Sequence, residues 1–308
     1  MTRPRLRLSL ALLLALGCAA GTARTEAFSE SPATSAPRGT LLIVGGGTQP
    51  QELVKHFVDL AGGPGKARIA ILPMATSAAA EAGAEKEAQL DSLGADSFVL
   101  NFNRAHADDD SLVKKVRTAT GIWFPGGDQS LLTAALGGSA VLREIHERYN
   151  AGAVVGGTSA GAAVMSDSMI TGNQYYPGLA TAVDSSSFTR IARRAIEIVP
   201  GLGFMHNAIV DQHFIRRQRE NRLISVVLER PSLLGVGIDE GTALKVTPDG
   251  KWLVLGKSAV MILDARRART NAAHAPVLGA TDIRMSLLPA GSTYDPRTGE
   301  TVLPDTRE

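Results

Sequence analysis

Apolar runs and amphipathic stretches alternate along the first part of the chain. The apolar runs are short and end in glycine or proline, whereas the amphipathic stretches extend over eight or more residues. Continuous apolar strands separated by helices are typical of a parallel sheet with both faces covered. The predicted strands are 40–44, 67–72, 97–100, 121–124 and 153–155, and the predicted helices are 51–60, 79–93, 111–118 and 140–149.

The pattern changes beyond residue 184. One helix is predicted at 214–229, and turn sequences such as Pro248-Asp249-Gly250 separate several short strands. Closely spaced strands joined by turns predict antiparallel pairing. We therefore predict a single α/β domain over residues 39–308, with a mostly parallel sheet flanked by helices and a C-terminal antiparallel extension. The additional strands are 209–210, 234–238, 243–246, 252–254 and 259–263.

The first 23 residues have the pattern of an export signal. Three arginines precede the apolar run 8–16, and small residues follow it. This order is typical of a secretory signal peptide, and the run is too short to cross a bilayer. Cys18, the only cysteine, could carry a lipid, so soluble export (secreted or periplasmic) and a lipid anchor at the cell surface both stay open. Residues 24–38 are rich in Ser, Thr, Ala and Pro and predict a linker.

Composition excludes several classes of partner and cofactor. The 308 residues are 44% hydrophobic, enough for one large core, and carry a net charge of +2. So small a net charge does not favour nucleic acid as a partner. No His/Cys/carboxylate cluster has metal-ligand spacing. The glycine triplet 45–47 follows a strand but lacks the spacing of a dinucleotide or P-loop fingerprint. We expect neither a metal nor a cofactor.

The sequence Gly157-Thr158-Ser159-Ala160-Gly161 lies between the strand 153–155 and a small-residue helix predicted at 160–165. G-x-S-x-G at such a junction is typical of a nucleophile elbow, in which glycines permit a tight turn. The helix N-terminus directs free N–H groups to the place where an oxyanion would form. The alternative is a Gly/Ser turn that caps an ordinary helix. We interpret Ser159 as a nucleophile.

A nucleophilic serine needs a base, and the base needs an orienting acid. Of the six histidines, His213 comes just after the strand 209–210, at the sheet end where functional residues gather. Asp239 and Glu240 end another strand, and at most one can serve because adjacent strand residues point to opposite faces. The order serine, histidine, acid differs from that of the α/β-hydrolases.

Four motifs together resemble the cyanophycinases, serine peptidases related to the aspartyl dipeptidases, with a class I glutamine amidotransferase-like fold. The motifs are GTSAGA at 157–162, PGGDQ at 125–129, DQHF at 211–214 and GIDE at 237–240. The resemblance spans about residues 40–265 and implies Ser159 as nucleophile, His213 as base and Glu240 as acid. It also implies a homodimer, and an oxyanion hole formed by the backbone N–H groups of Gly127 and Ala160.

The resemblance further implies a substrate. Cyanophycin is a poly-aspartate chain with an arginine on each β-carboxyl group, and cyanophycinases release β-Asp-Arg dipeptides from it. Arg216 has no counterpart in the family pattern and is expected on the surface. The residues implied to bind guanidinium groups are Gln129, Asp211 and Gln212, and those implied to bind carboxylates are Arg217, Arg219 and Arg222.

Three functions are therefore compared. The first is an exported serine exopeptidase that degrades cyanophycin through an acyl-enzyme. The second is an exported peptidase for other β-aspartyl or acidic dipeptides, and the third is a non-catalytic, amidotransferase-like binding protein. The complete set of serine, histidine and glutamate favours an enzyme. The long segment 166–206, with its polar stretch 184–187, is expected to be a loop that shapes the pocket.

Overall fold

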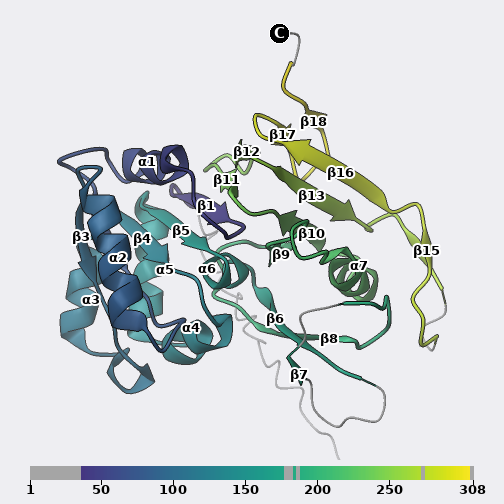
Figure 1. Cartoon of the computed structure of the whole chain (residues 1–308), viewed down its shortest axis with the longest axis horizontal. Helices are drawn as coiled ribbons and strands as arrows, with labels where there is room; N and C mark the ends of the chain where they lie inside the picture. Colours follow the sequence, from purple (N-terminus) through teal and green to yellow (C-terminus); the bar gives the residue numbers. More distant parts are fainter. Residues whose placement is uncertain (1–35, 177–182, 185–187, 272–274, 306–308) are drawn as a thin grey trace, which may run out of the picture. The chain divides into compact units, whose positions relative to one another are not determined.

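A nine-stranded sheet forms the centre of the fold in the computed structural model, which describes residues 36–176, 183–184, 188–271 and 275–305 (Figure 1). Its strand order is β18-β17-β12-β11-β1-β5-β4-β2-β3. The five strands from β1 to β3 in this order are parallel, and β11 pairs with β1 in the antiparallel sense. The parallel strands are β1 (Thr40–Val44), β2 (Arg68–Ile71), β3 (Asp96–Val99), β4 (Gly121–Phe124) and β5 (Val154–Thr158); the others are β11 (Thr242–Val246), β12 (Trp252–Gly256), β17 (Thr293–Tyr294) and β18 (Thr301–Val302).

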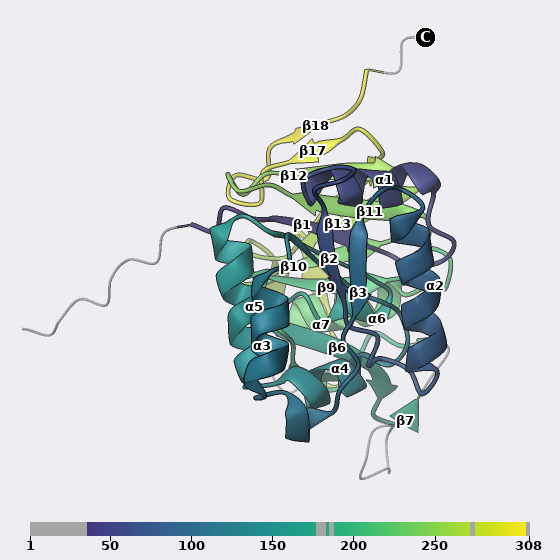
Figure 2. The same cartoon turned by 90° about the vertical axis from the view of Figure 1, so that its left-hand side faces the viewer.

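Helices cover both faces of the parallel strands (Figure 2). The helices α1 (Gln51–Leu60) and α2 (Ala79–Asp91) bury residues such as Phe57 and Leu90 on one face. On the other face, α3 (Asp110–Arg117) and α5 (Ala140–Ala151) contribute to the larger core. Three short helical segments complete this half: a 3₁₀ turn (Arg104–His106), α4 (Gln129–Leu136) and α6 (Ala160–Ala163). No helix in the described ranges is long and apolar enough to cross a membrane.

A second sheet of four strands has the order β16-β13-β10-β9. Its parallel pair β9–β10 continues into antiparallel β13 and β16. Val236 and Ile262 of this sheet share one core with Leu244 and Val254 of the first, whereas α7 (Glu220–Glu229) packs on the opposite face. The two sheets therefore form adjacent layers. The strands are β9 (Ala208–Gln212), β10 (Leu234–Ile238), β13 (Ala259–Asp264) and β16 (Arg284–Pro289).

Two small sheets lie outside these layers. Strands β6 (Ser168–Gln174) and β8 (Ile196–Pro200) pair with each other, and β7 (Val183–Asp184) pairs with β6. The expectation that 166–206 is a loop is therefore wrong for much of its described part. Residues 185–187 of the polar stretch lie outside the described residues. The last pair is β14 (Arg269–Thr270) with β15 (Ala280–Thr281).

The predicted fold class is confirmed, with two corrections. Only part of the expected C-terminal extension joins the first sheet, because β9, β10 and β13 leave it to form the second. The helix predicted at 214–229 begins only at Glu220, because His213 and Gln218 have positive φ angles (48° and 52°) that a right-handed helix cannot contain. The sequence also did not predict α4, β6, β8 or β16. The predicted signal (1–23), Cys18 and most of the linker lie outside the described residues.

Candidate active site

Ser159 occupies a strained turn between β5 and α6, with φ 55° and ψ −110°. Its N–H donates a hydrogen bond to the Val44 carbonyl oxygen at 3.1 Å. The turn has no room for extra side chains. A β-carbon at Gly157 would lie 2.5 Å from the Gly161 oxygen, and one at Gly161 would lie 2.0 Å from the Phe124 oxygen. The strain, held in place by this packing, lifts the hydroxyl from the end of the sheet.

His213 links Ser159 to Glu240. Its Nε2 lies 2.8 Å from the Ser159 Oγ, and its Nδ1 lies 2.6 Å from the Glu240 Oε1. Because a carboxylate only accepts, Nδ1–H is the donor, and Nε2 is left to accept the hydroxyl proton. The His213 backbone, just past β9, donates to the Gly45 oxygen at 2.6 Å. The structure thus brings together the three residues of the predicted triad in the geometry that proton transfer requires.

The neighbouring acid, Asp239, has a different set of partners. Its Oδ1 accepts from the backbone N–H of Arg216 at 2.9 Å, and its Oδ2 accepts from the hydroxyl of Ser258 at 2.8 Å. Asp239 therefore stabilises the turn that follows His213, while Glu240 contacts the imidazole. Both residues lie just beyond β10, so only one of the two acids contacts His213, as expected.

Burial lowers the pKa of His213 below its ordinary value of 6.5, because the low-dielectric surroundings disfavour the imidazolium. The hydrogen bond to Glu240 acts in the opposite direction, and the nearby charges of Arg217 and Arg219 lower the pKa further. Only 9% of the His213 side chain is exposed, compared with 32% for Glu240. A lowered pKa favours the neutral imidazole, which is the form that the predicted general base requires.

The glycine triplet after β1 packs directly on the triad, a role that the sequence did not reveal. Gly46, with φ 108°, leaves no space for a side chain, since its β-carbon would lie 2.4 Å from the His213 ring. A β-carbon at Gly47 would lie 2.8 Å from the Glu240 Oε2. The N–H of Gly241 donates to the Gly46 oxygen at 2.9 Å and fixes the loop. The only sequence signal was a glycine run at a strand's carboxyl end.

The predicted oxyanion donors flank Ser159. Ala160 is the first residue of α6, and the loop carrying Gly127 runs beside the nucleophile, since a β-carbon at Gly126 would touch the Ser159 Cβ at 3.4 Å. Gly127 has φ 139°, and a β-carbon there would lie 2.1 Å from the Ala75 oxygen. Among the described residues, neither the Gly127 nor the Ala160 N–H donates to another protein atom. Both remain available to an incoming oxygen.

Gln129 begins α4 and is buried. Its amide nitrogen donates to the backbone oxygens of Ile170, at 2.9 Å, and Thr171. These contacts fix the amide against β6 and leave its oxygen as the atom suited to accept from a guanidinium.

Asp211 and Arg222 form a buried ion pair. The Arg222 Nε donates to the Asp211 Oδ2 at 2.6 Å, and Nη2 donates to Oδ1. The side chains are 0% and 1% exposed, and the Phe188 ring lies 4.6 Å from the guanidinium carbon. We expected these residues to bind substrate groups of opposite charge. The structure instead pairs them with each other, because α7 packs its buried face against the second sheet at β10, the neighbour of β9.

The remaining predicted residues lie near His213 in different settings. Arg219 donates through Nη1 to the backbone oxygen and the side-chain oxygen of Gln212, at 2.6 and 2.8 Å. Arg217 is exposed, and so is Arg216, as expected for the latter. Arg217 therefore has the most exposed side chain of the predicted carboxylate-binding set, whereas Arg219 is held by Gln212 and lies 3.8 Å from the Asp211 Oδ1.

Comparisons with known proteins agree with these motifs. The profile of peptidase family S51 matches residues 41–254. The cyanophycinase of Synechococcus elongatus is 36% identical over 208 residues, which are 65% of this chain and 60% of the relative's length. The cyanophycinase of Geminocystis herdmanii (strain PCC 6308) is 34% identical over 272 residues, covering 85% of this chain and 95% of that relative. The cyanophycinase of Nostoc sp. (strain PCC 7120 / SAG 25.82 / UTEX 2576) is 32% identical over 275 residues, or 86% and 88%.

A solved structure supports the fold. A peptidase from an acI-B1 actinobacterium superposes with a TM-score of 0.60 at 23% identity, covering 88% of this chain and 98% of that one. The sequence relatives confirm the resemblance to cyanophycinases. The chain belongs to peptidase family S51.

Proposed function

We propose that this chain is an exported serine-type exopeptidase that hydrolyses cyanophycin to β-Asp-Arg dipeptides through an acyl-enzyme on Ser159. The observation that carries the proposal is the hydrogen-bonded chain from Glu240 through His213 to the Ser159 hydroxyl. Membership of peptidase family S51 supports a peptidase, and the curated cyanophycinases supply the substrate class.

The chemistry follows from the position of each group. The Ser159 Oγ attacks the scissile carbonyl carbon while His213 Nε2 takes the hydroxyl proton, and Glu240 stabilises the resulting imidazolium. The N–H groups of Gly127 and Ala160 donate to the oxyanion. His213 then returns the proton to the leaving nitrogen, and an ester remains on Ser159. Water repeats the sequence: His213 takes its proton, the hydroxide cleaves the ester, and the proton goes back to the Ser159 oxygen.

Groups around the nucleophile support recognition of a zwitterionic substrate. The side-chain oxygen of Gln129 is available to accept from a guanidinium, whereas Arg217 and Arg219 are suited to free carboxylates. Gln212 contributes as the partner of Arg219. Asp211 and Arg222 form a buried ion pair with each other, so we assign them a structural role beneath the substrate-binding residues rather than direct contact with substrate.

A peptidase for other β-aspartyl peptides is the second candidate. The burial of Asp211 and Arg222 favours it, because fewer free charges than expected remain to select the arginyl group. A binding protein without turnover is disfavoured, because it has no need of a neutral imidazole between a carboxylate and a serine. Export by the signal at 1–23, a lipid on Cys18 and assembly into a homodimer belong to the proposal as expectations from the sequence.

The test is incubation with insoluble cyanophycin, followed by mass analysis of the soluble products. We expect β-Asp-Arg dipeptides from the wild-type protein and none from Ser159→Ala, since loss of a triad residue costs several orders of magnitude in rate. A serine-directed phosphonylating reagent should add one mass increment to the peptide that contains Ser159. Near-normal turnover by Ser159→Ala would reject the nucleophile. Efficient cleavage of other β-aspartyl peptides would favour the second candidate.

A further inference from the structure

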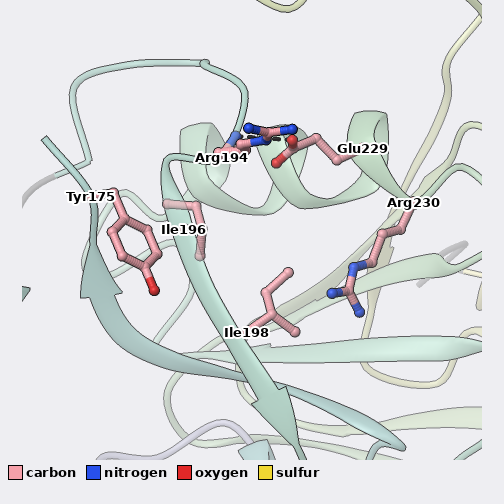
Figure 3. A pocket seen from close by; sticks show the side chains of 6 residues that line it. All are labelled: Tyr175, Arg194, Ile196, Ile198, Glu229 and Arg230. Carbon is pink, nitrogen blue, oxygen red and sulfur yellow. Dashed lines mark hydrogen bonds between the residues drawn. The ribbon is translucent and has the colours of Figure 1, made fainter. Parts of the chain in front are cut away.

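A hollow of about 590 Å³ lies between the small sheet of β6 and β8 and the C-terminal end of α7 (Figure 3). None of the triad residues lines it. Its walls combine an aromatic ring, an apolar surface, a carboxylate and two guanidinium groups. The lining residues are Tyr175, Arg194, Ile196, Ile198, Glu229 and Arg230.

The floor of the hollow is apolar. Ile196 and Ile198 are two residues apart on β8 and so face the same side of the strand. Figure 3 shows both between the Tyr175 ring on one side and the Arg230 side chain on the other. Tyr175 is 37% exposed, so part of its side chain is accessible to a ligand. An apolar floor with polar ends suits the methylene stem of a long charged side chain.

Glu229 supplies a negative charge at the edge of this floor. Its Oε1 accepts from the backbone N–H of Arg194 at 2.9 Å, which fixes the carboxylate in place. Within the described ranges no cationic side chain forms an ion pair with it, so Oε2 is available to a ligand. A guanidinium group bound to Oε2 would form a charge-assisted hydrogen bond, and the Tyr175 ring lies across Ile196 from this carboxylate (Figure 3).

Arg230, the residue after Glu229, supplies a positive charge on the side of the floor away from Tyr175 (Figure 3). Its Nη1 donates to the Ser168 hydroxyl at 3.0 Å, which holds the guanidinium beside β6. The part of the chain that the structure describes contains no carboxylate paired with Arg230. The planar group can therefore bind a ligand carboxylate through its remaining N–H donors. The hollow thus presents one carboxylate and two guanidinium groups around an apolar floor, with the Arg194 side chain beside Glu229 (Figure 3).

We propose that this hollow is a distal subsite that binds an arginyl unit of the cyanophycin chain. The guanidinium of the unit lies between Glu229 and Tyr175, its methylenes cover Ile196 and Ile198, and its free carboxylate contacts Arg230. The proposal rests on the proposed function for the identity of the polymer, but its chemistry requires only a ligand with a guanidinium and a carboxylate on one flexible stem.

The spacing fits a polymer that is already engaged at Ser159. Arg219 precedes α7 and binds Gln212, next to His213, while Glu229 ends the helix. Ten helical residues rise about 15 Å. An extended chain covers that distance with roughly four or five residues at about 3.3–3.6 Å each. Binding at the second site would therefore raise the affinity for long chains through effective concentration, with no new contact at the triad.

The binding test uses the Ser159→Ala protein, which avoids turnover. It is titrated with L-arginine and with L-citrulline, whose side chain has nearly the same shape but ends in an uncharged urea group, while the NMR signals of Tyr175, Ile196 and Ile198 are followed. We expect arginine to shift these signals and citrulline to bind at least roughly tenfold more weakly, as the loss of about 1.4 kcal/mol requires. Glu229→Gln should abolish this preference. Equal responses to both ligands, or none, would overturn the proposal.

The kinetic test compares kcat/KM for long cyanophycin with that for a chain of two units. Glu229→Gln and Arg230→Gln should each lower the ratio of the two values by about tenfold, whereas the matched changes Glu300→Gln and Arg267→Gln, on exposed residues elsewhere, should not. An unchanged ratio in the first pair would reject the distal subsite. A wild-type protein that cleaves neither chain would instead reject the proposed function, and the arginine titration would still decide the subsite.

Discussion

Gly46 lies against the imidazole of His213, and a β-carbon at this glycine would lie 2.4 Å from both Cε1 and Nε2. The backbone after β1 therefore packs directly against the His213 ring and limits where the ring can lie. The same loop accepts the His213 N–H through the Gly45 oxygen at 2.6 Å. The positions of the His213 ring and of its backbone therefore both depend on the glycine loop at 45–47, about 170 residues earlier in the sequence.

We predict that Gly46→Ala lowers kcat by about a hundredfold or more, because the added methyl group must displace the ring by about 1 Å from Ser159. The measurement is hydrolysis of cyanophycin, together with the unfolding free energy in urea. Gly63→Ala is the control, since Gly63 also has a positive φ (84°) but nothing within 4 Å of its β-carbon position. Equal losses of activity in the two variants would attribute the effect to backbone strain alone.

The two adjacent acids should differ in their effects. Glu240→Gln removes the charge that orients His213 and should lower kcat by about 10⁴-fold, with little change in stability. Asp239→Asn weakens the contacts to Arg216 and Ser258 and should cost about 1–2 kcal/mol of stability, with a much smaller loss of rate. Single-turnover kinetics and urea unfolding separate the two. The reverse pattern would show that Asp239 is the catalytic acid.

The pH profile should report the lowered pKa of His213. We expect kcat/KM to rise with pH along a limb whose midpoint lies below 6.5, since only the neutral imidazole can accept the serine proton. Arg217→Gln removes a charge that lowers this pKa, so the midpoint should move upward; Arg216→Gln should leave it in place. A midpoint above 6.5 in the wild type would contradict the assignment.

The same shift makes a contribution to stability with a definite sign. The folded-state pKa lies below the unfolded value of 6.5, so between the two the unfolded chain binds more protons. This contribution is zero above pH 6.5, and stability falls as the pH drops from 6.5 through the folded-state value. His213→Gln removes it, and urea unfolding at several pH values measures the difference.

In the buried pair of Asp211 and Arg222, loss of one partner should destabilise the fold more than replacement of both by apolar residues. Arg222→Ala removes the main partner of Asp211, which keeps only the Arg219 Nη1 at 3.8 Å from its Oδ1, and should lower the unfolding free energy by about 3–5 kcal/mol. The double change Asp211→Leu with Arg222→Met replaces both charges by apolar groups and should recover most of that loss. If the pair has only a structural role, Ser159 in the double variant should react with a small phosphonylating reagent as it does in the wild type. A stable double variant that reacts with the reagent but not with cyanophycin would indicate that the pair contacts substrate.

For export, we predict that the mature chain begins at or after Cys18. Intact mass measurement of the protein made in its natural host decides between the two routes. A diacylglyceryl adduct on Cys18 identifies a lipoprotein, and a lipid-free start near residues 22–26 identifies soluble export. A chain that retains Met1 would contradict both.

Short sequence patterns were enough to predict the parallel strands and the turn that carries Ser159. The apolar runs gave the five parallel strands to within a few residues, and the elbow around Ser159 followed from glycines whose absent side chains leave room for the turn. His213 was singled out by its place at a strand end, whereas strand position left Asp239 and Glu240 both open and only the resemblance to the cyanophycinases implied Glu240. These features reside in short windows of sequence, so periodicity and turn chemistry suffice to find them.

Other features depend on contacts distant in sequence. The end of β9 continues into a turn rather than a helix because Asp239 accepts from Arg216 and His213 takes a positive φ. Arginines that look alike in the sequence divide between an exposed position at 217 and a fully enclosed one at 222. No pattern on a single segment contains that information, because the packing of α7 against the second sheet decides it.

Ser159 follows a strand of the first sheet, whereas His213 follows a strand of the second. Their 2.8 Å contact therefore spans two layers held together by the shared apolar core. Sliding of one layer over the other by a single ångström would disconnect nucleophile from base while each sheet kept all its backbone hydrogen bonds. Enzymatic activity would then be lost before the circular dichroism signal of the secondary structure changes. Activity would therefore report how well the two layers are aligned.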